Sequence, residues 1–327
     1  MPVRHRLLAV AVAVMWGANF TAIHASLEHF PPFFLVALRF AVIALPTLLL
    51  VPWPGVRVRW LVGYGLGFGT VQFLFLYWGM AVGMPAGLAS LVLQASAPFT
   101  VVLGATLLRE RLSGRQVLGI LVAMGGLAVV GWYRAEVAQV LPFLLTLAGA
   151  LGWAVGNICS RQAQPRNPLH LTLWMSVVPP LPMLVVSLAV EGPGAIGRSL
   201  ATALTPAAVP ALLGLAYTVL VGTVLGSGIW VWLMSRHPAA VVAPYSLLVP
   251  VAGMAVAWLA LGERVAPTEA LGGLVVITGV LLGSLGRRRP LPVSSRPTES
   301  AGAAELGGQA GPVEPAPEPA AGTTKGG

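Results

Sequence analysis

Ten long apolar runs, separated by short segments rich in charged or turn-forming residues, dominate the chain up to about residue 286. Most have about the twenty residues that a helix needs to cross a bilayer. They do not alternate polar and apolar positions as the strands of a membrane β-barrel do. The pattern therefore predicts an all-α polytopic membrane protein with ten transmembrane helices. Their expected limits are 6–24, 33–51, 60–79, 85–107, 115–132, 138–159, 168–190, 207–233, 238–261 and 267–286.

The segments outside these runs are of two kinds. The connections are short, which predicts one bundle rather than separate domains. Residues 290–327 are mostly Pro, Gly, Ala, Ser and Glu and include no aromatic residue, so we expect a disordered cytoplasmic tail. The first run follows a basic start but lacks a small-residue cleavage site, so we interpret it as a span rather than as a signal peptide.

Composition agrees with a membrane protein and excludes several kinds of chemistry. Hydrophobic residues make up 57% of the chain and charged residues only 9%, whereas about a quarter of a soluble domain is charged. Aspartate is absent and Cys159 is the one cysteine. This excludes a disulfide scaffold, a thiolate zinc site and any Asp-based centre. We expect neither a metal nor a cofactor.

The basic residues gather at alternate ends of the expected spans. With a cytoplasmic N-terminus, 13 arginines fall inside and 3 outside, as the positive-inside rule requires. We therefore expect both termini in the cytoplasm, a multi-pass protein of the inner (plasma) membrane, and a net charge of +9 that reflects topology rather than nucleic-acid binding. The inner set is Arg4, Arg6, Arg57, Arg59, Arg109, Arg111, Arg115, Arg161, Arg166, Arg236, Arg287, Arg288 and Arg289, and the outer set is Arg134, Arg198 and Arg264.

The two halves of the chain repeat one another. A shift of 153 residues aligns some forty positions without a gap, and nearer the start of each half Trp16 matches Trp153 and Asn19 lies close to the place of Asn157. The halves 6–132 and 138–286 each contain five spans, an odd number, so we expect them to lie in opposite orientations, as in many secondary transporters. The shift pairs Pro85 with Pro238, Glu110 with Glu263, Gly119 with Gly272, and Gly126 with Gly279.

Several segments resemble the EamA family of the drug/metabolite transporter superfamily. They are residues 16–20 (WGANF), 31–32 (PP), 38–40 (LRF), 83–94 (GMPAGLASLVLQ), 108–112 (LRERL) and 242–251 (VAPYSLLVPV). The likeness is greatest to members that export O-acetylserine and cysteine. The resemblance implies a secondary active carrier that exports such small amino-acid metabolites by alternating access, without a cofactor. One position departs from the family, because His24 stands where a lysine is common.

Two prolines fall in the middle of the fourth and ninth runs. Pro98 and Pro250 each remove a helical donor, which leaves the carbonyl groups of Gln94 and Ser246 free. Ser90 lies one helical turn before Gln94. These side chains either line a cavity at the membrane midplane or belong to packing kinks, and the sequence leaves both interpretations open.

Arg39 is the one permanently charged side chain inside a span. A guanidinium group at that depth can hold a substrate carboxylate, or it can reach the outer surface and pair with Glu28. The remaining candidates for substrate binding are Trp16, Asn19, Trp153, Asn157 and Tyr245, and His24 is a weak candidate for proton coupling. For Glu110 and Glu263 we expect pairing with a neighbouring arginine or helix termination.

Three classes of function remain. A carrier of small zwitterions fits a cavity with little charge, whereas a sugar phosphate or nucleotide would need several cations. A carrier of other metabolites or drugs fits the same repeats. An integral-membrane enzyme would need a converging acid, base or nucleophile, which the five histidines near span ends and the lack of aspartate do not offer. Export or uptake, the coupling ion and the oligomeric state stay open.

Overall fold

Every regular element is a helix in the residues that the structure, a computed structural model, describes: 1–109, 112–136, 140–237 and 239–284. Nine helical stretches in these ranges are long and apolar enough to cross a membrane, and a tenth apolar helix, Pro267–Gly283, is slightly shorter. The all-α polytopic fold is therefore confirmed. The expected tail, 290–327, lies outside the described residues.

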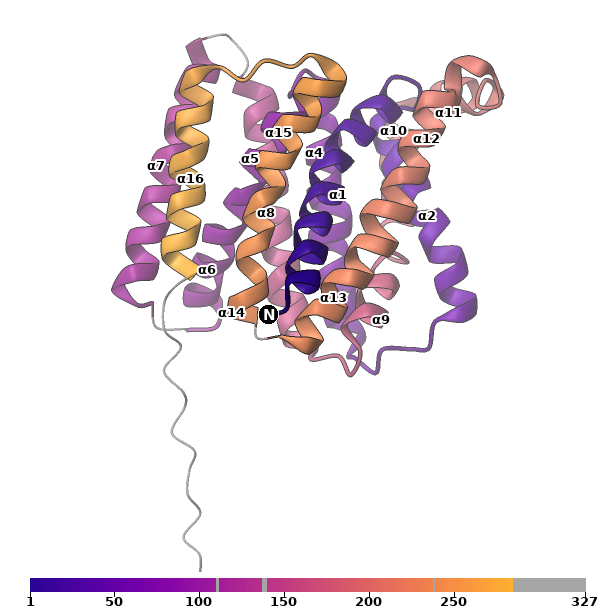
Figure 1. Cartoon of the computed structure of the whole chain (residues 1–327). Helices are drawn as coiled ribbons and strands as arrows, with labels where there is room; N and C mark the ends of the chain where they lie inside the picture. The colour runs from indigo at the N-terminus through magenta and orange to yellow at the C-terminus, as the bar shows by residue number, and fades with distance from the viewer. Residues whose placement is uncertain (110–111, 137–139, 238, 285–327) are drawn as a thin grey trace, which may run out of the picture. The chain divides into compact units, whose positions relative to one another are not determined.

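Five of the expected spans are single helices (Figure 1): α1 (Val3–Leu27), α2 (Pro32–Leu50), α7 (Gly114–Glu136), α8 (Val140–Ala163) and α16 (Pro267–Ser284). The other five are divided. The third consists of α3 (Val58–Tyr64), η1 (Gly65–Val71) and α4 (Gln72–Ala81), and the fourth of α5 (Ala86–Val92), η2 (Leu93–Ala95) and α6 (Ser96–Leu107). The seventh is α9 (Pro168–Met175) with α10 (Pro180–Val190). The eighth comprises η3 (Pro206–Ala208), α12 (Val209–Ala216), η4 (Tyr217–Leu225) and α13 (Gly226–Arg236), and the ninth α14 (Ala239–Val242), η5 (Ala243–Leu247) and α15 (Leu248–Leu261).

One helix was not expected. The connection between the seventh and eighth runs contains α11 (Gly192–Ala201), which has proline in its first turn. Ile196 and Ser199 are its buried residues, and the backbone carbonyl of Ser199 contacts His29 at 2.9 Å. Contact with the turn after α1 therefore holds this short helix at the end of the bundle.

Four of the five divided spans correspond between the halves, the third with the eighth and the fourth with the ninth, whereas the counterpart of the divided seventh span is the single helix α2. Pro98 and Pro250 each follow a short 3₁₀ turn, η2 and η5, which confirms the expected break in regular hydrogen bonding. The third and eighth spans each contain a π-helical segment, η1 and η4. In them Gly69-Thr70 and Gly222-Thr223 are 153 residues apart, the shift of the sequence repeat.

The helices pack in pairs that also match between the halves. α1 packs against α15 and the eighth span, while α8 packs against the third and fourth spans. α2 packs on α10, and α7 packs on α16. If each helix is replaced by its counterpart in the other half, the same set of pairs results.

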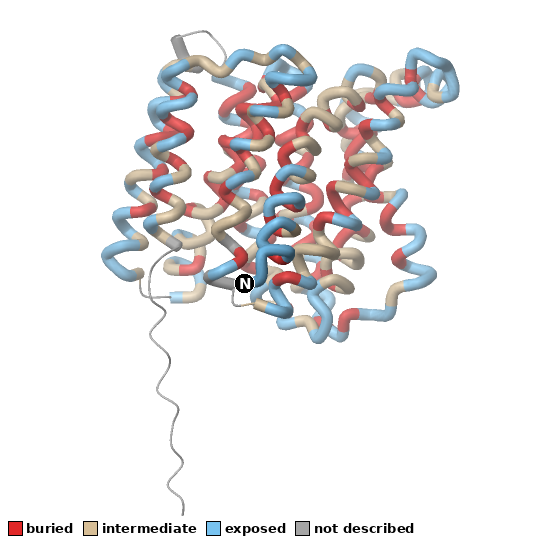
Figure 2. Tube along the Cα trace, viewed as in Figure 1, coloured by how far each residue is buried: buried red, intermediate tan, exposed pale blue. Residues whose placement is uncertain are grey.

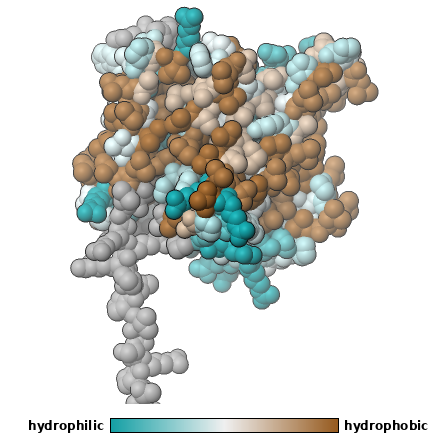
Figure 3. Space-filling model, viewed as in Figure 1, coloured by the Kyte–Doolittle hydropathy of each residue, from teal (hydrophilic) through white to brown (hydrophobic). Residues whose placement is uncertain are grey.

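Glycines bring α7 and α16 into close contact. A Cβ atom on Gly119 would lie 2.6 Å from the Gly279 carbonyl oxygen, and one on Gly126 would lie 2.6 Å from the Gly272 carbonyl oxygen. Small residues allow this approach in a membrane, where van der Waals packing drives association. Figure 2 shows exposed residues along the outer sides of these helices, and Figure 3 shows a broad hydrophobic surface across the flank of the bundle.

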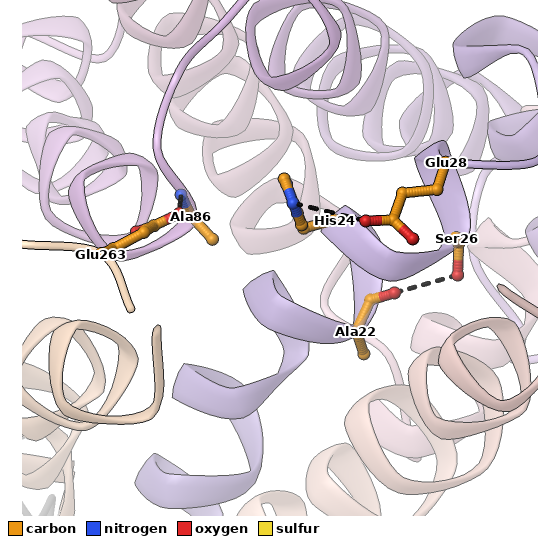
Figure 4. Close-up of polar contacts among 6 residues, drawn as sticks. All are labelled: Ala22, His24, Ser26, Glu28, Ala86 and Glu263. Carbon is orange, nitrogen blue, oxygen red and sulfur yellow. Dashed lines mark hydrogen bonds and ion pairs between the residues drawn. The ribbon is translucent and has the colours of Figure 1, made fainter. Parts of the chain in front are cut away.

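Two carboxylates from the second half cap helices of the first half. Glu263 accepts hydrogen bonds from the backbone N–H groups of Ala86 (2.8 Å) and Gly87 (3.0 Å), as Figure 4 shows in part. Glu191 accepts from those of Phe33 (2.7 Å) and Phe34 (3.0 Å). Each carboxylate satisfies two N–H groups that the start of a helix leaves without partners.

Of the two expectations for Glu263, the structure contradicts pairing with Arg264 and agrees with helix termination. α15 ends at Leu261, Gly262 follows with a φ of 67°, and the Glu263 carboxylate then reaches α5. The matching residue, Glu110, lies outside the described residues. We call the Glu263 and Glu191 contacts the two carboxylate clamps.

Replacing Glu263 with alanine should lower the stability of the folded protein by about 1–2 kcal/mol, because two capped N–H groups lose their acceptor. Thermal unfolding of the detergent-purified protein measures this. Glu28→Ala is the matched control, since the Glu28 side chain is 66% exposed and lies 3.9 Å from His24. Equal unfolding temperatures for the two variants would contradict the clamp's contribution.

Candidate functional site

A cavity of about 460 Å³ lies among the spans. Its walls come from α1, α2 and the third, fourth, sixth, seventh, eighth and ninth spans. Eight of the nine residues that the sequence proposes for substrate binding line it: Trp16, Asn19, Arg39, Ser90, Gln94, Trp153, Asn157 and Ser246. Both halves therefore contribute to one space.

Aromatic rings form much of the wall. Trp16 packs on Trp230 with ring centroids 5.1 Å apart, and its indole N–H donates to the Gly222 carbonyl at 2.9 Å. Trp153 meets Phe68 edge to face at 5.7 Å. Trp16 and Trp153, which match in the repeat, thus both border the cavity. Trp230 does so as well.

Arg39 is the charged residue of this cavity, and its side chain is buried. Its two terminal nitrogens donate to the Tyr77 hydroxyl (3.1 Å) and the Thr223 hydroxyl (3.0 Å). Its guanidinium carbon lies 4.2 Å from the centre of the Phe73 ring. Cation–π contact and these two hydrogen bonds offset part of the cost of burying the charge.

The structure corrects one interpretation of Arg39. The side chain does not reach the outer surface, since it is only 5% exposed, and it does not pair with Glu28. Among the residues that the structure describes, Arg39 has no carboxylate partner. A buried cation without an anion attracts one strongly, because little solvent screens it.

The two proline-broken spans meet at the cavity. The side-chain amide of Gln94 donates to the backbone carbonyl of Ser246 at 3.4 Å, which links the two halves across the cavity. The Ser90 hydroxyl donates to the Gly87 carbonyl at 2.5 Å within its own helix. Both earlier interpretations therefore hold in part, because these residues line the cavity and also satisfy local backbone groups.

Three further amide side chains, besides that of Gln94, border the same space. Asn157 donates to the Thr100 hydroxyl at 3.1 Å. Asn19 and Gln72 each have a buried amide oxygen without a hydrogen-bond partner. Gln72 is 3% exposed, and sequence reasoning missed it because a lone glutamine in an apolar run gives no repeat signal.

Two of the proposed residues lie elsewhere. Tyr245 directly precedes Ser246 but packs with a separate apolar cluster that includes Ala9, Leu233 and Val242. His24 lies near the end of α1, its ring nitrogen 3.9 Å from a Glu28 carboxylate oxygen (Figure 4), and is not part of the cavity wall. Substrate binding by Tyr245 and proton coupling by His24 stay predictions.

A helical membrane protein with a central cavity, broken helices around it and one buried cation has the features of a membrane carrier. The model of the EamA-like transporter family matches residues 5–132 and again residues 140–285. The chain belongs to this family. Membership of a transporter family decides against the enzyme interpretation.

Relatives share most of the chain. A "probable amino-acid metabolite efflux pump" of Escherichia coli (strain K12) is 40% identical over 288 residues, which cover 86% of this chain and 95% of the relative. A "probable terminal-alkyne amino-acid exporter" of Streptantibioticus cattleyicolor is 30% identical over 237 residues, covering 70% and 75%. A solved crystal structure matches with a TM-score of 0.56 at 19% identity, over 87% of this chain and 98% of that one, and supports the fold alone.

Proposed function

We propose that this transporter exports small amino-acid-type metabolites, such as cysteine or O-acetylserine, across the plasma membrane. The observation that carries the proposal is Arg39, a buried cation at the cavity without a carboxylate partner among the described residues. A substrate carboxylate supplies the missing anion. The names of the relatives from Escherichia coli and Streptantibioticus cattleyicolor agree with a substrate of this class.

A zwitterion fits the remainder of the cavity better than a phosphorylated solute. One guanidinium group matches one carboxylate, whereas a phosphate carries about two negative charges near pH 7 and favours several cations. The amide oxygens of the wall and the broken-helix carbonyls are acceptors for an ammonium group. The aromatic side chains provide apolar contact for the rest of the molecule.

Overproduction of the protein tests this function. Secretion of cysteine-pathway metabolites and tolerance to them should both rise in cells with the wild-type protein. Cells with an equal amount of the Arg39→Gln variant should show neither effect. Secretion of no amino-acid metabolite, with tolerance gained only to bulky hydrophobic drugs, would favour the drug carrier instead.

We further propose alternating access by two inverted five-helix repeats, 6–132 and 138–286. Support comes from the matching breaks, the exchangeable helix pairs and the two separate matches to the family. The cavity wall extends toward both ends of the spans, since Ile23 and Ser90 line it about 6 Å from the end of α1 and the start of α5. Tyr64 and Thr172 line the cavity within about 9 Å of the starts of α3 and α9, at the end where the N-terminus lies (Figure 1). Both carboxylate clamps lie at the other end of the spans, away from the N-terminus.

Reporter fusions test this orientation. Reporters placed after Trp78 and after Arg198 should be active on the outside, and reporters after Arg59 and after Arg166 on the inside, because basic residues are retained in the cytoplasm. An alkaline phosphatase and a fluorescent protein, fused at the same four sites, give opposite signals. One reversed site would contradict the inverted repeats.

A further inference from the structure

The Thr223 hydroxyl has two contacts with different roles. It donates to the backbone carbonyl of Thr218, five residues earlier, at 2.9 Å. It accepts from a terminal nitrogen of Arg39 at 3.0 Å. A hydroxyl has one hydrogen to donate. Because the Thr218 carbonyl takes that hydrogen, the lone pairs of the hydroxyl face the guanidinium group.

The π-helical segment η4 explains why threonine stands here. In a π-helix the backbone bonds span five residues instead of four, and the hydroxyl of Thr223 bonds a carbonyl at the same spacing. Thr223 lines the cavity but is only 8% exposed, so little of its surface meets solvent. The direction of this acceptor is therefore set by the helix and not by solvent.

The first half of the chain holds the side of the guanidinium group that faces away from Thr223. The Tyr77 hydroxyl on α4 accepts from the second terminal nitrogen at 3.1 Å, and the Phe73 ring packs 4.2 Å from the guanidinium carbon. Two of the five N–H groups of an arginine are thus occupied. The plane and direction of the group are fixed before a ligand arrives, which reduces the cost of binding.

We propose that Thr223 is a positioning residue that orients the Arg39 guanidinium group toward the carboxylate of the substrate. The proposal rests on the proposed function, in which Arg39 binds that carboxylate. Tyr77 has the same role from the first half. Discrimination between a free carboxylate and an uncharged ester then depends on these two hydroxyls as well as on Arg39.

The repeat supplies a matched control. Thr70 stands 153 residues before Thr223, near the end of η1, and its hydroxyl donates to the Gly65 carbonyl five residues earlier at 3.2 Å. Thr70 is also buried, at 7% exposed, but it does not line the cavity. Arg39 donates to Thr223 and Tyr77 and not to Thr70. Thr70→Val therefore removes the same kind of π-helix bond without a contact to the cation.

Transport of L-cysteine by the full-length protein in sealed proteoliposomes tests the proposal, with L-cysteine methyl ester as competitor. Thr223→Val should raise the KM for L-cysteine about tenfold, with a smaller change in the maximal rate. The same variant should also lower the ratio of the affinity for L-cysteine to the affinity for its methyl ester by a similar factor. Thr223→Ser keeps a hydroxyl, so its KM for L-cysteine and its preference for the acid should be close to those of the wild type. Tyr77→Phe should change the KM and the preference in the same direction as Thr223→Val.

The outcomes separate this proposal from the function on which it rests. Equal KM changes in Thr70→Val and Thr223→Val, or a Thr223→Val variant with the wild-type preference for acid, would overturn the positioning role and leave Arg39 as the carboxylate site. If the ester competes as well as the acid with the wild-type protein, the proposed function itself fails. If Thr223→Val does not purify as a single species, Tyr77→Phe and Thr223→Ser decide by the same two readouts.

Discussion

Arg39→Gln should reduce transport of L-cysteine at low concentration by about ten- to a hundredfold. A hydrogen bond to a charged group contributes about 1.5–3 kcal/mol, and each 1.4 kcal/mol changes an equilibrium tenfold. Arg39→Lys keeps the charge but loses the planar fork that bonds Tyr77 and Thr223, so it should recover only part of the activity. Initial rates of uptake into sealed proteoliposomes measure both variants.

Stability distinguishes a lost binding group from a damaged fold. Removing a buried charge that has no counter-ion removes its desolvation cost as well, so Arg39→Gln should unfold within about 1 kcal/mol of the wild type. Arg198→Gln, on the exposed face of α11, is the control for loss of a positive charge. Full activity of Arg39→Gln would exclude Arg39 as the carboxylate site.

Gly126→Val should destabilise the protein by about 1–3 kcal/mol or more, because the added side chain meets backbone atoms that cannot move aside. A Cβ atom there would lie 2.6 Å from the Gly272 carbonyl oxygen and 2.7 Å from the Val276 nitrogen. The two helices would have to separate along their contact. Thermal unfolding, followed by loss of the single size-exclusion peak in detergent, measures the change.

Gly125→Val is the matched control, since a Cβ atom on Gly125 meets nothing within 4 Å. The two substitutions are chemically identical and differ only in the direction of the side chain. Equal unfolding temperatures would mean that the contact between α7 and α16 relaxes without cost.

The helical fold could be predicted because hydropathy reports burial in a bilayer directly. Sequence reasoning also identified eight of the cavity residues, because Trp16 matches Trp153 in the repeat, Pro98 and Pro250 mark breaks in corresponding spans, and Arg39 is a charge inside a span. Tyr245 was the exception among the nine candidates. It adjoins Ser246 on a 3₁₀ turn, and neighbouring residues on a helix point in different directions, so being next to a cavity residue did not place it on the wall.

The contacts of Arg39 could not be predicted in the same way. Tyr77 and Thr223 lie 38 and 184 residues away in the chain, and each sits in an apolar run where a hydroxyl side chain carries no positional signal. The π-helical segments could not be predicted from the sequence either, because they do not change its hydrophobic period. The partner of Glu263 on α5 was missed for a related reason, since it is 177 residues away while Arg264 is adjacent.

The two carboxylate clamps have a kinetic consequence for the resting carrier. If the resting cavity opens to the cytoplasm and outward opening breaks all four of their hydrogen bonds, at about 1 kcal/mol net each, the empty protein faces outward for roughly one part in a thousand of the time. A solute inside the cell then meets a site that is already formed. The same solute outside would show an apparent Kd about a thousandfold weaker, because the conformation that it needs is so rare. Product that accumulates in the medium would therefore hardly occupy the empty carrier, while the direction of net transport would still follow the substrate gradient and any gradient coupled to it.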